Sequence, residues 1–166
     1  MHDSDNALTS DAKGDLLEEL VKYLFDKIPG VSFHKKNVLD GVRAHELDVV
    51  FKNDKRVSDC YFLDFVIITE CKNTGRRLGS MGVRWFIDKL RDRGVSIGIL
   101  ISLSGITGLA DGISNAHSEV INALIRDKVS ILILSREEIE ILTTTDELVN
   151  LLQDKILSLT IERTVL

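Results

Sequence analysis

Three charged residues occupy strand positions at which apolar or β-branched residues are preferred. Asp48 interrupts a short apolar run, and Glu70 and Lys72 close the long apolar run that begins at Tyr61. Because the side chains of a strand alternate between its two faces, Glu70 and Lys72 share one face and Cys71 points to the other. If the two strands are neighbours, Asp48 lies beside Glu70. Two carboxylates at such close range repel each other unless a cation lies between them.

These residue types suit chemistry on a phosphate ester. Paired carboxylate oxygens are ligands for Mg²⁺ or Mn²⁺ rather than for zinc. A lysine beside them can hold an attacking water or neutralise charge that develops on a phosphate. Two structural explanations compete with this one: Asp48 in an exposed edge strand, and Glu70 and Lys72 at a strand end that emerges into solvent. Since 28% of the chain is charged, an Asp followed by a later Glu-x-Lys also arises by chance.

The apolar periodicity predicts the elements that must position these residues. A helix over residues 16–28, capped by Ser10 or Asp11, ends at Pro29. Ser80 is the expected cap of the helix that follows the third strand, and Ser135 opens a short helix with a capping box. The other expected elements are strands at 31–38, 46–51, 61–71, 95–102 and 129–134, helices at 80–93, 107–126 and 145–157, and a tail or edge strand at 160–166.

The resulting order, α-β-β-β-α-β-α-β-α-α, predicts a single α/β domain. We expect this domain to span residues 12–158, between a polar N-terminal tail at 1–11 and a C-terminal tail or edge strand at 159–166. The 166 residues, 44% of them hydrophobic, suffice for one core and exclude wholesale disorder.

Charge and composition bound the kind of protein. No apolar run is long enough to span a bilayer, the acidic start is unlike a signal peptide, and two cysteines are too few for a disulfide scaffold. We therefore expect a cytoplasmic protein with reduced thiols and no membrane partner. The net charge is −5, yet residues 72–93 hold seven basic and two acidic residues. This basic segment fits a polyanion site and fits a solvated helix face equally well. Trp85 and Phe86, inside the segment, are expected in the core.

The sequence around Asp48 and Glu70-Cys71-Lys72 resembles the PD-(D/E)xK nuclease superfamily, and in particular its Mrr-type restriction endonuclease-like domains. The core order of that fold is α-β-β-β-α-β, which is the order predicted above. Residues 14–18 (Gly-Asp-Leu-Leu-Glu) are similar to the first-helix motif of those domains, and the segments 98–107 and 130–134 are similar to their later strands. The resemblance covers roughly residues 12–142. It implies a restriction-endonuclease-like fold, with a central mixed β-sheet flanked by helices.

The resemblance also implies roles for individual residues. Asp48 and Glu70 become the metal carboxylates, and the backbone carbonyl of Cys71 becomes a further ligand. Lys72 becomes the catalytic lysine. Glu18 becomes a first-helix acid that orients a metal or the lysine, with the neighbouring Glu19 as the competing choice. The residues expected to contact a nucleic-acid backbone are the basic ones nearby: Arg76, Arg77, Arg84, Lys35 and Lys36.

Other polar residues carry weaker signals. His34, His45 and His117 have no partner visible in the sequence, so structural or surface roles are favoured over catalysis. Glu46 lies on the face of Asp48 and could be an outer ligand, but an exposed strand position is the better explanation.

The expected activity is that of a Mg²⁺-dependent or Mn²⁺-dependent endonuclease, an endodeoxyribonuclease that hydrolyses phosphodiester bonds of DNA, with double-stranded DNA as the favoured substrate. The resemblance implies a role in restriction or defence. Cutting both strands favours a homodimer, and because no target-reading domain precedes residue 12, sequence readout is expected from a separate recognition partner. Two alternatives stay open: a non-catalytic binding module that keeps the same fold, and a DNA-repair or junction nuclease.

Overall fold

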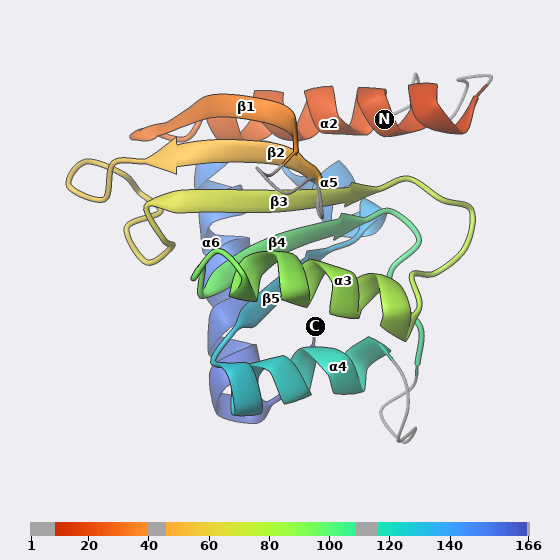
Figure 1. Cartoon of the computed structure of the whole chain (residues 1–166). Coiled ribbons are helices and arrows are strands. Elements are labelled where there is room, and N and C mark those ends of the chain that lie inside the picture. Colours follow the sequence, from red (N-terminus) through yellow and green to blue (C-terminus); the bar gives the residue numbers. More distant parts are fainter. Residues whose placement is uncertain (1–8, 40–45, 109–115, 166) are drawn as a thin grey trace.

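The protein has an α/β fold built on one five-stranded mixed sheet, as its sequence predicts (Figure 1). The structure, a computed structural model, describes residues 9–39, 46–108 and 116–165. Strand order in the sheet follows chain order, with β1–β2 and β2–β3 antiparallel and β3–β4 and β4–β5 parallel. The strands are β1 (Val31–Leu39), β2 (Glu46–Asn53), β3 (Val66–Lys72), β4 (Ile97–Ser102) and β5 (Ser130–Leu134).

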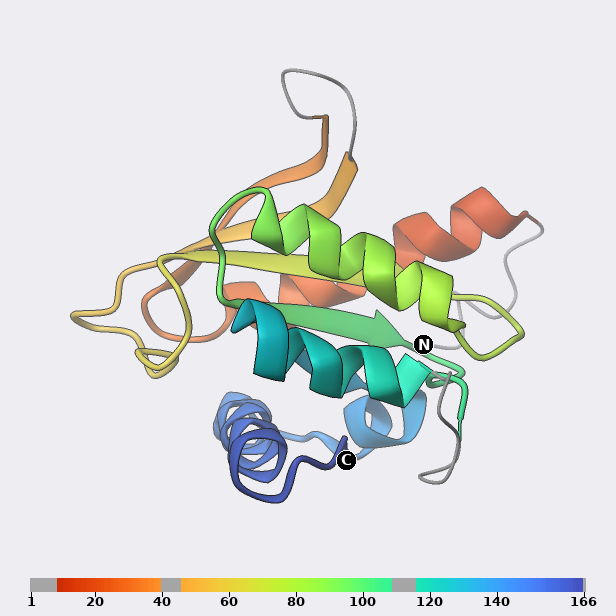
Figure 2. The same cartoon turned by 60° about the horizontal axis from the view of Figure 1, so that its bottom comes forward.

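Helices cover both faces of this sheet, as Figures 1 and 2 show from two directions. One face packs against α2 (Ser10–Asp26), α5 (Arg136–Ile141) and α6 (Thr145–Leu157). The other packs against α3 (Ser80–Arg91), α4 (Ala116–Asn122) and the π-helical turn η1 (Ala123–Asp127), and a second π-helical turn, η2 (Ser158–Glu162), follows α6.

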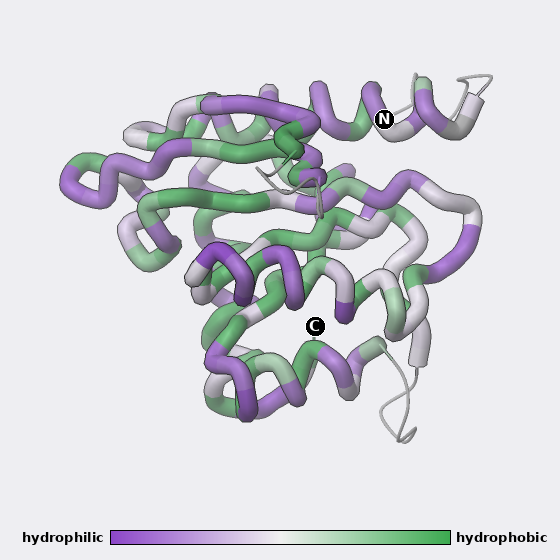
Figure 3. The backbone as a smooth tube through the Cα atoms, in the orientation of Figure 1, coloured by the Kyte–Doolittle hydropathy of each residue, from purple (hydrophilic) through white to green (hydrophobic). Residues whose placement is uncertain are grey.

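Each face of the sheet has its own hydrophobic core. Alternate residues of β2 divide between them, because strand side chains alternate: Val49 and Phe51 join the core under α2, and Val50 joins the core under α3. Figure 3 shows hydrophobic residues concentrated in the central strands, whereas β1, at the sheet edge, is largely hydrophilic. The inner strands are therefore buried on both faces, as their near-continuous apolar sequences predict.

A glycine in β4 allows α3 to lie close to the sheet. A Cβ atom built on Gly98 would lie 2.8 Å from Cζ of Phe86 and would collide with Cδ1 of Leu90, both of α3. Since no larger residue fits at this crossing without a shift, the sequence of β4 determines how closely α3 packs. Lys89, which lies between Phe86 and Leu90 in α3, is thereby held close to β3.

Several element boundaries differ from the sequence-based expectations. The third strand begins at Val66, not at Tyr61, because the preceding residues form a loop in which the carboxylate of Asp64 accepts hydrogen bonds from the backbone N–H groups of Ser96 (2.7 Å) and Ile97 (3.1 Å). Asp64 thus ties the loop to the start of β4 and does not continue the strand.

Two predicted helix caps were also wrong. Thr9, not Ser10 or Asp11, is the N-cap of α2, and its hydroxyl accepts a hydrogen bond from the backbone N–H of Ala12. In α3 the N-cap is Gly79, and Ser80 is the first helical residue. The capping box at Ser135 and the bounds of the helix at 145–157 are confirmed.

The C-terminal third departs most from expectation. The long helix predicted at 107–126 begins at Ala116 and ends as the π-helical turn η1, while residues 107 and 108 are not helical and 109–115 lie outside the described residues. The expected edge strand at 160–166 is not a strand over the described part of that range, because η2 continues the chain from α6. Across the described ranges, no helix combines the length and the apolar character needed to cross a membrane.

Candidate functional site

The pairing of β2 with β3 brings Asp48, Glu70 and Lys72 together. Val49 pairs with Thr69 in the antiparallel register, so Asp48 and Glu70 are the next residues along each strand. The ammonium Nζ of Lys72 lies 2.8 Å from Oε1 of Glu70 and 3.5 Å from Oδ2 of Asp48. The three residues that the sequence singled out therefore form one cluster at the end of β3.

The backbone of β3 holds Asp48 from the other side. The N–H of Cys71 donates a hydrogen bond of 2.7 Å to Oδ2 of Asp48. Burial and the nearby Glu70 raise the pKa of Asp48 above its usual range, although Lys72 and the Cys71 N–H act in the opposite direction. The Cys71 thiol is buried in the core beneath α2, and burial raises its pKa well above the usual value. A carbonyl ligand role for Cys71 stays a prediction.

A second lysine, Lys89 of α3, completes the environment of Glu70. Its Nζ lies 2.6 Å from Oε2 of Glu70, and the two side chains are only 9% and 7% exposed. Both carboxylate oxygens of Glu70 are thus paired, one with Lys72 and one with Lys89. Lys89 was not among the predicted site residues. The available signal was weak: a charged residue three positions after Phe86, on the buried side of an amphipathic helix.

The first helix adds a third acid–lysine pair. Glu18 of α2 is 12% exposed, and Nζ of Lys36 of β1 lies 3.4 Å from its Oε2. Burial and the nearby Asp48 raise the pKa of Glu18, while Lys36 lowers it, so Glu18 adjoins the cluster. Its neighbour Glu19 is 52% exposed and also contacts Lys36, at 3.0 Å. Burial therefore favours Glu18 over Glu19 as the member of the site.

Acids and lysines alternate in the cluster, and Lys36 is shared with two acids of α2 outside it, Asp15 and Glu19. Three carboxylates, those of Glu18, Asp48 and Glu70, lie among three ammonium groups, those of Lys36, Lys72 and Lys89. The sequence predicts that Asp48 and Glu70 repel each other unless a cation lies between them, and the ammonium of Lys72 is such a cation. Of the three acids, Glu18 retains one oxygen, Oε2, that is buried and has no hydrogen-bond partner.

The oxygen-rich composition of the cluster fits a divalent cation. Glu18, Asp48 and Glu70 offer the hard ligands that Mg²⁺ and Mn²⁺ prefer, and Oε2 of Glu18 is a buried oxygen that accepts no hydrogen bond, although the ammonium of Lys36 lies 3.4 Å from it. In the described part of the chain, however, no three His, Cys, Asp or Glu side chains lie close enough together to hold a metal ion as they stand. The lysines occupy the positions between the acids.

The other basic residues lie outside this cluster. Arg76 and Arg77 are exposed in the loop between β3 and α3, and no acidic side chain of the described residues forms an ion pair with either of them. Arg84 of α3 pairs with Glu119 of α4 at 2.6 Å, and Lys35 is exposed on β1. Only Lys36, among the expected backbone-binding residues, contacts a residue of the site.

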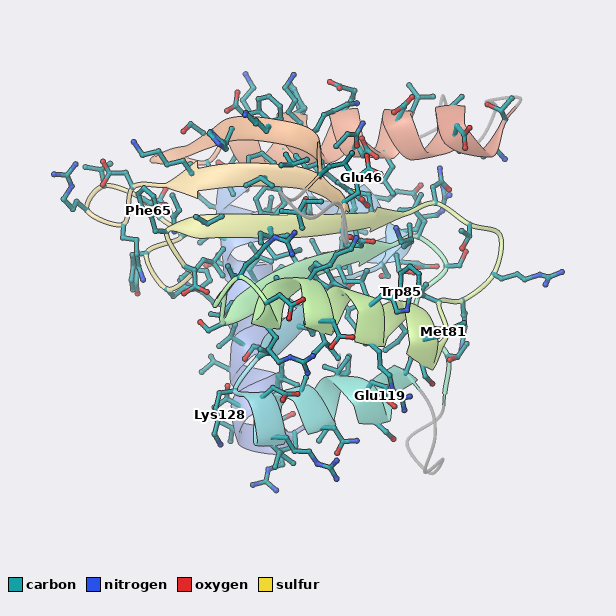
Figure 4. The ribbon with its side chains drawn as sticks, viewed as in Figure 1. Glu46, Phe65, Met81, Trp85, Glu119 and Lys128 are labelled. Carbon is teal, nitrogen blue, oxygen red and sulfur yellow. The ribbon has the colours of Figure 1, made fainter. Side chains whose placement is uncertain are left out.

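The remaining polar residues do not join the site. His34 is exposed, and His45 lies outside the described residues. His117 lines a cavity of about 310 Å³ at the carboxyl ends of β4 and β5 together with Arg77, and burial followed by the charge of Arg77 lowers its pKa. Glu46 is exposed at the start of β2 (Figure 4).

Comparison with family models, with curated proteins and with solved structures finds no match to this chain. Proposals about its function therefore depend on the geometry of the cluster and on the motif that it contains.

Proposed function

We propose that the protein is a Mg²⁺-dependent or Mn²⁺-dependent endonuclease of the PD-(D/E)xK type, which hydrolyses phosphodiester bonds of DNA. The observation that carries this proposal is the contact of one lysine ammonium, that of Lys72, with the two carboxylates of Asp48 and Glu70. An Asp and a later Glu-x-Lys occur in many sequences, but in this chain they also lie on neighbouring strands, β2 and β3, with Glu18 close to Asp48.

Each side chain has a role in this reaction. Asp48, Glu70 and Glu18 would hold the divalent cation, which when bound supplies Lewis-acid stabilisation of negative charge on the phosphoryl oxygens. Lys72 positions its ammonium to neutralise charge that develops on the attacked phosphate. Lys89 fixes one oxygen of Glu70, so that the carboxylate keeps one orientation.

The arrangement of elements supports a restriction-endonuclease-like fold. The order α2-β1-β2-β3-α3-β4 is the core order that the resemblance implies, and two antiparallel pairings followed by a parallel one make the sheet mixed, as expected. In this fold proposal the site lies on β2 and β3, and α2 contributes Glu18 from the sheet's opposite face. A role in restriction or defence, and a homodimer that cuts both strands, belong to the same proposal.

One observation favours a second candidate, a nucleic-acid-binding or protein-binding module without catalysis. The ion pairs of Lys72 and Lys89 satisfy both oxygens of Glu70, so the cluster is complete as a structural salt-bridge network. In such a module, divalent cations would neither bind the cluster nor alter its interactions.

Cleavage assays distinguish the two candidates. The full chain is incubated with supercoiled plasmid and with single-stranded circular DNA in Mg²⁺, Mn²⁺ or EDTA. We expect cleavage with either metal and none in EDTA, and we expect Asp48→Asn and Lys72→Met each to abolish it, since each removes a group that acts on the phosphate or its metal. Lys52→Met is the matched control, because Lys52 is exposed at the opposite end of β2.

A second comparison tests the assignment of the first-helix acid. Glu18→Gln should reduce cleavage more than Glu19→Gln, since only Glu18 is buried beside Asp48. Full activity of Lys72→Met, or cleavage that persists in EDTA, would contradict the proposed function and leave the binding module in first place.

A further inference from the structure

Two large apolar side chains project from α3 into solvent. Met81 is 72% exposed and Trp85 is 63% exposed. They are four residues apart on one helix, so they lie next to each other on the same face. Trp85 and Phe86 were both expected in the core, but of the two only Phe86 is buried. Figure 4 shows Met81 and Trp85 at the amino-terminal half of α3.

This exposed face lies next to the candidate site. Trp85 precedes Lys89 by one helical turn, a spacing that puts their Cβ atoms about 5–6 Å apart. The ammonium of Lys89 is 2.6 Å from Glu70. Because helical side chains lean toward the amino terminus, the indole of Trp85 extends from there toward the loop between β3 and α3. A ligand that touches the indole therefore contacts the helix that follows this loop and that supplies Lys89 to the site.

The charges around the apolar pair favour a polyanion. Arg76 and Arg77, in the loop that leads into α3, are exposed and form no ion pair with a described acidic residue. The acid nearest in sequence to Trp85, Asp88, is already paired with Arg91 at 2.6 Å. The loop that leads into α3 thus carries guanidinium groups without such an ion pair, and the helix that follows carries an exposed aromatic ring; these are the two components that bind single-stranded nucleic acid.

We propose that Trp85 and Met81 form a stacking platform for an unpaired base of a nucleic-acid strand, with Arg76 and Arg77 holding the adjoining phosphates. This inference rests on the proposed function and specifies its substrate class as single-stranded or locally unpaired nucleic acid, in place of the intact duplex expected from the sequence. Inside an intact duplex both faces of each base are covered by neighbouring bases, so an indole cannot stack there.

The test uses the fluorescence of Trp85, the only tryptophan of the chain. The full chain is titrated in EDTA with a dT20 oligonucleotide, with a 20-base-pair duplex, and with inorganic polyphosphate, which has the charge but no bases. We expect saturable quenching by dT20, much weaker quenching by the duplex, and none by polyphosphate. Equal quenching by duplex and single strand, or none by dT20, would overturn the proposal.

Substitutions measure the contribution of the ring. Trp85→Ala should weaken binding of labelled dT20, followed by anisotropy, by about 5- to 100-fold, the range expected for one stacked base. Trp85→Phe, which keeps a ring, should retain most of the affinity. The matched control is Tyr61→Ala, an exposed aromatic residue in the loop before β3, at the other end of that strand from Lys72. Unchanged binding by Trp85→Ala would overturn the stacking platform.

The experiment separates this inference from the proposed function. Quenching by dT20 without any metal-dependent cleavage would contradict the nuclease and leave the stacking platform standing. Metal-dependent cleavage with unaltered fluorescence would contradict the stacking platform and leave the nuclease standing. If raising the protein concentration alone changed the fluorescence, and Trp85→Ala abolished a dimer seen in sedimentation, the face would belong to a second copy of the chain and the proposal would be wrong.

Discussion

Replacing Lys89 with methionine removes one charge from a buried ion pair while keeping most of the side-chain volume. The pair joins α3 to β3 through a contact of 2.6 Å, and both side chains are less than a tenth exposed. Loss of one partner leaves the carboxylate of Glu70 buried and short of a counterion. Breaking such a pair typically costs about 3–5 kcal/mol of unfolding free energy.

The structure places the expected cost at the lower end of that range. Lys72 remains 2.8 Å from the other oxygen of Glu70, so its charge is not left wholly uncompensated. We therefore expect Lys89→Met to lower the free energy of unfolding by about 3 kcal/mol. For a chain of this size, that corresponds to a fall of about 6–12 °C in melting temperature.

Urea denaturation followed by circular dichroism measures this change, and the slope m should stay constant if only stability is altered. Glu70→Gln should cost a similar amount, because it leaves the ammonium of Lys89 buried. The double variant should lose far less than the two single losses together, since it removes both charges; the coupling should exceed about 1 kcal/mol. Lys35→Met, on the exposed edge of β1, is the control and should change stability by less than about 0.5 kcal/mol. Additive losses, or a Lys89→Met variant as stable as this control, would refute the ion-pair argument.

Three further predictions follow from other parts of the structure. If the cluster binds Mg²⁺ with a dissociation constant of about 1 mM, about 10 mM Mg²⁺ should add roughly 1.4 kcal/mol to the free energy of unfolding and raise the melting temperature by about 3–6 °C. Asp48→Asn should lose this response, and an equal response in both proteins would mean that the cluster does not bind the ion. Arg76→Ala combined with Arg77→Ala should weaken binding to all DNA sequences alike. Because each residue neutralises one phosphate, the plot of log K against log salt should flatten by up to about two units of slope. An unchanged slope would mean that these residues do not contact the phosphate backbone of the DNA. Burial, followed by the charge of Asp59, raises the pKa of the Cys60 thiol to about 12. The unfolded chain therefore releases this proton at lower pH than the folded protein, and the free energy of unfolding should fall by up to about 1.4 kcal/mol per pH unit as the pH rises above about 9. In denaturation measured from pH 8 to 10.5, Cys60→Ala should reduce that slope, and an identical slope would contradict the assignment.

Sequence patterns predicted the parts of the fold that local physics determines. The strands expected at 31–38 and 129–134 and the helix expected at 145–157 carry clear periodicity and punctuation, and they form with bounds that differ by at most one residue. The start of β3 could not be predicted in this way, because Tyr61 to Phe65 are as apolar as a strand. Their course depends on Asp64, which binds the backbone of a segment more than thirty residues later in the chain. Such a tertiary contact leaves no local signal.

The same limit applies to the site. The alternation of strand side chains predicted that Glu70 and Lys72 share a face, and the neighbouring positions of β2 and β3 bring Asp48 beside them. Lys36 and Lys89 belong to β1 and α3, and nothing in their own neighbourhoods shows which acid they meet. A lysine on the buried side of a helix has a partner, but the sequence does not identify it.

Trp85 shows the opposite error. Its apolar ring next to Phe86 suggested burial, although consecutive residues of a helix point about 100° apart and cannot both lie at the centre of the buried face. The buried residues Val83, Phe86 and Leu90 define that face, and Trp85 falls outside it. Attention to the helical period alone would have identified an exposed tryptophan.

The helix α3 contributes one residue to the cluster and another to the proposed binding face. Lys89 pairs with Glu70 of β3, and one turn earlier on the same helix Trp85 is exposed to solvent. Gly98 fixes the distance between this helix and the sheet, because a side chain there would push Phe86 and Leu90 away. A nucleic-acid strand bound on the exposed face of α3 and a phosphate bound at the cluster would thus both be positioned by this helix. Enlarging Gly98 should therefore disturb the Lys89–Glu70 contact and the binding face together, whereas changes confined to Trp85 should leave the cluster intact.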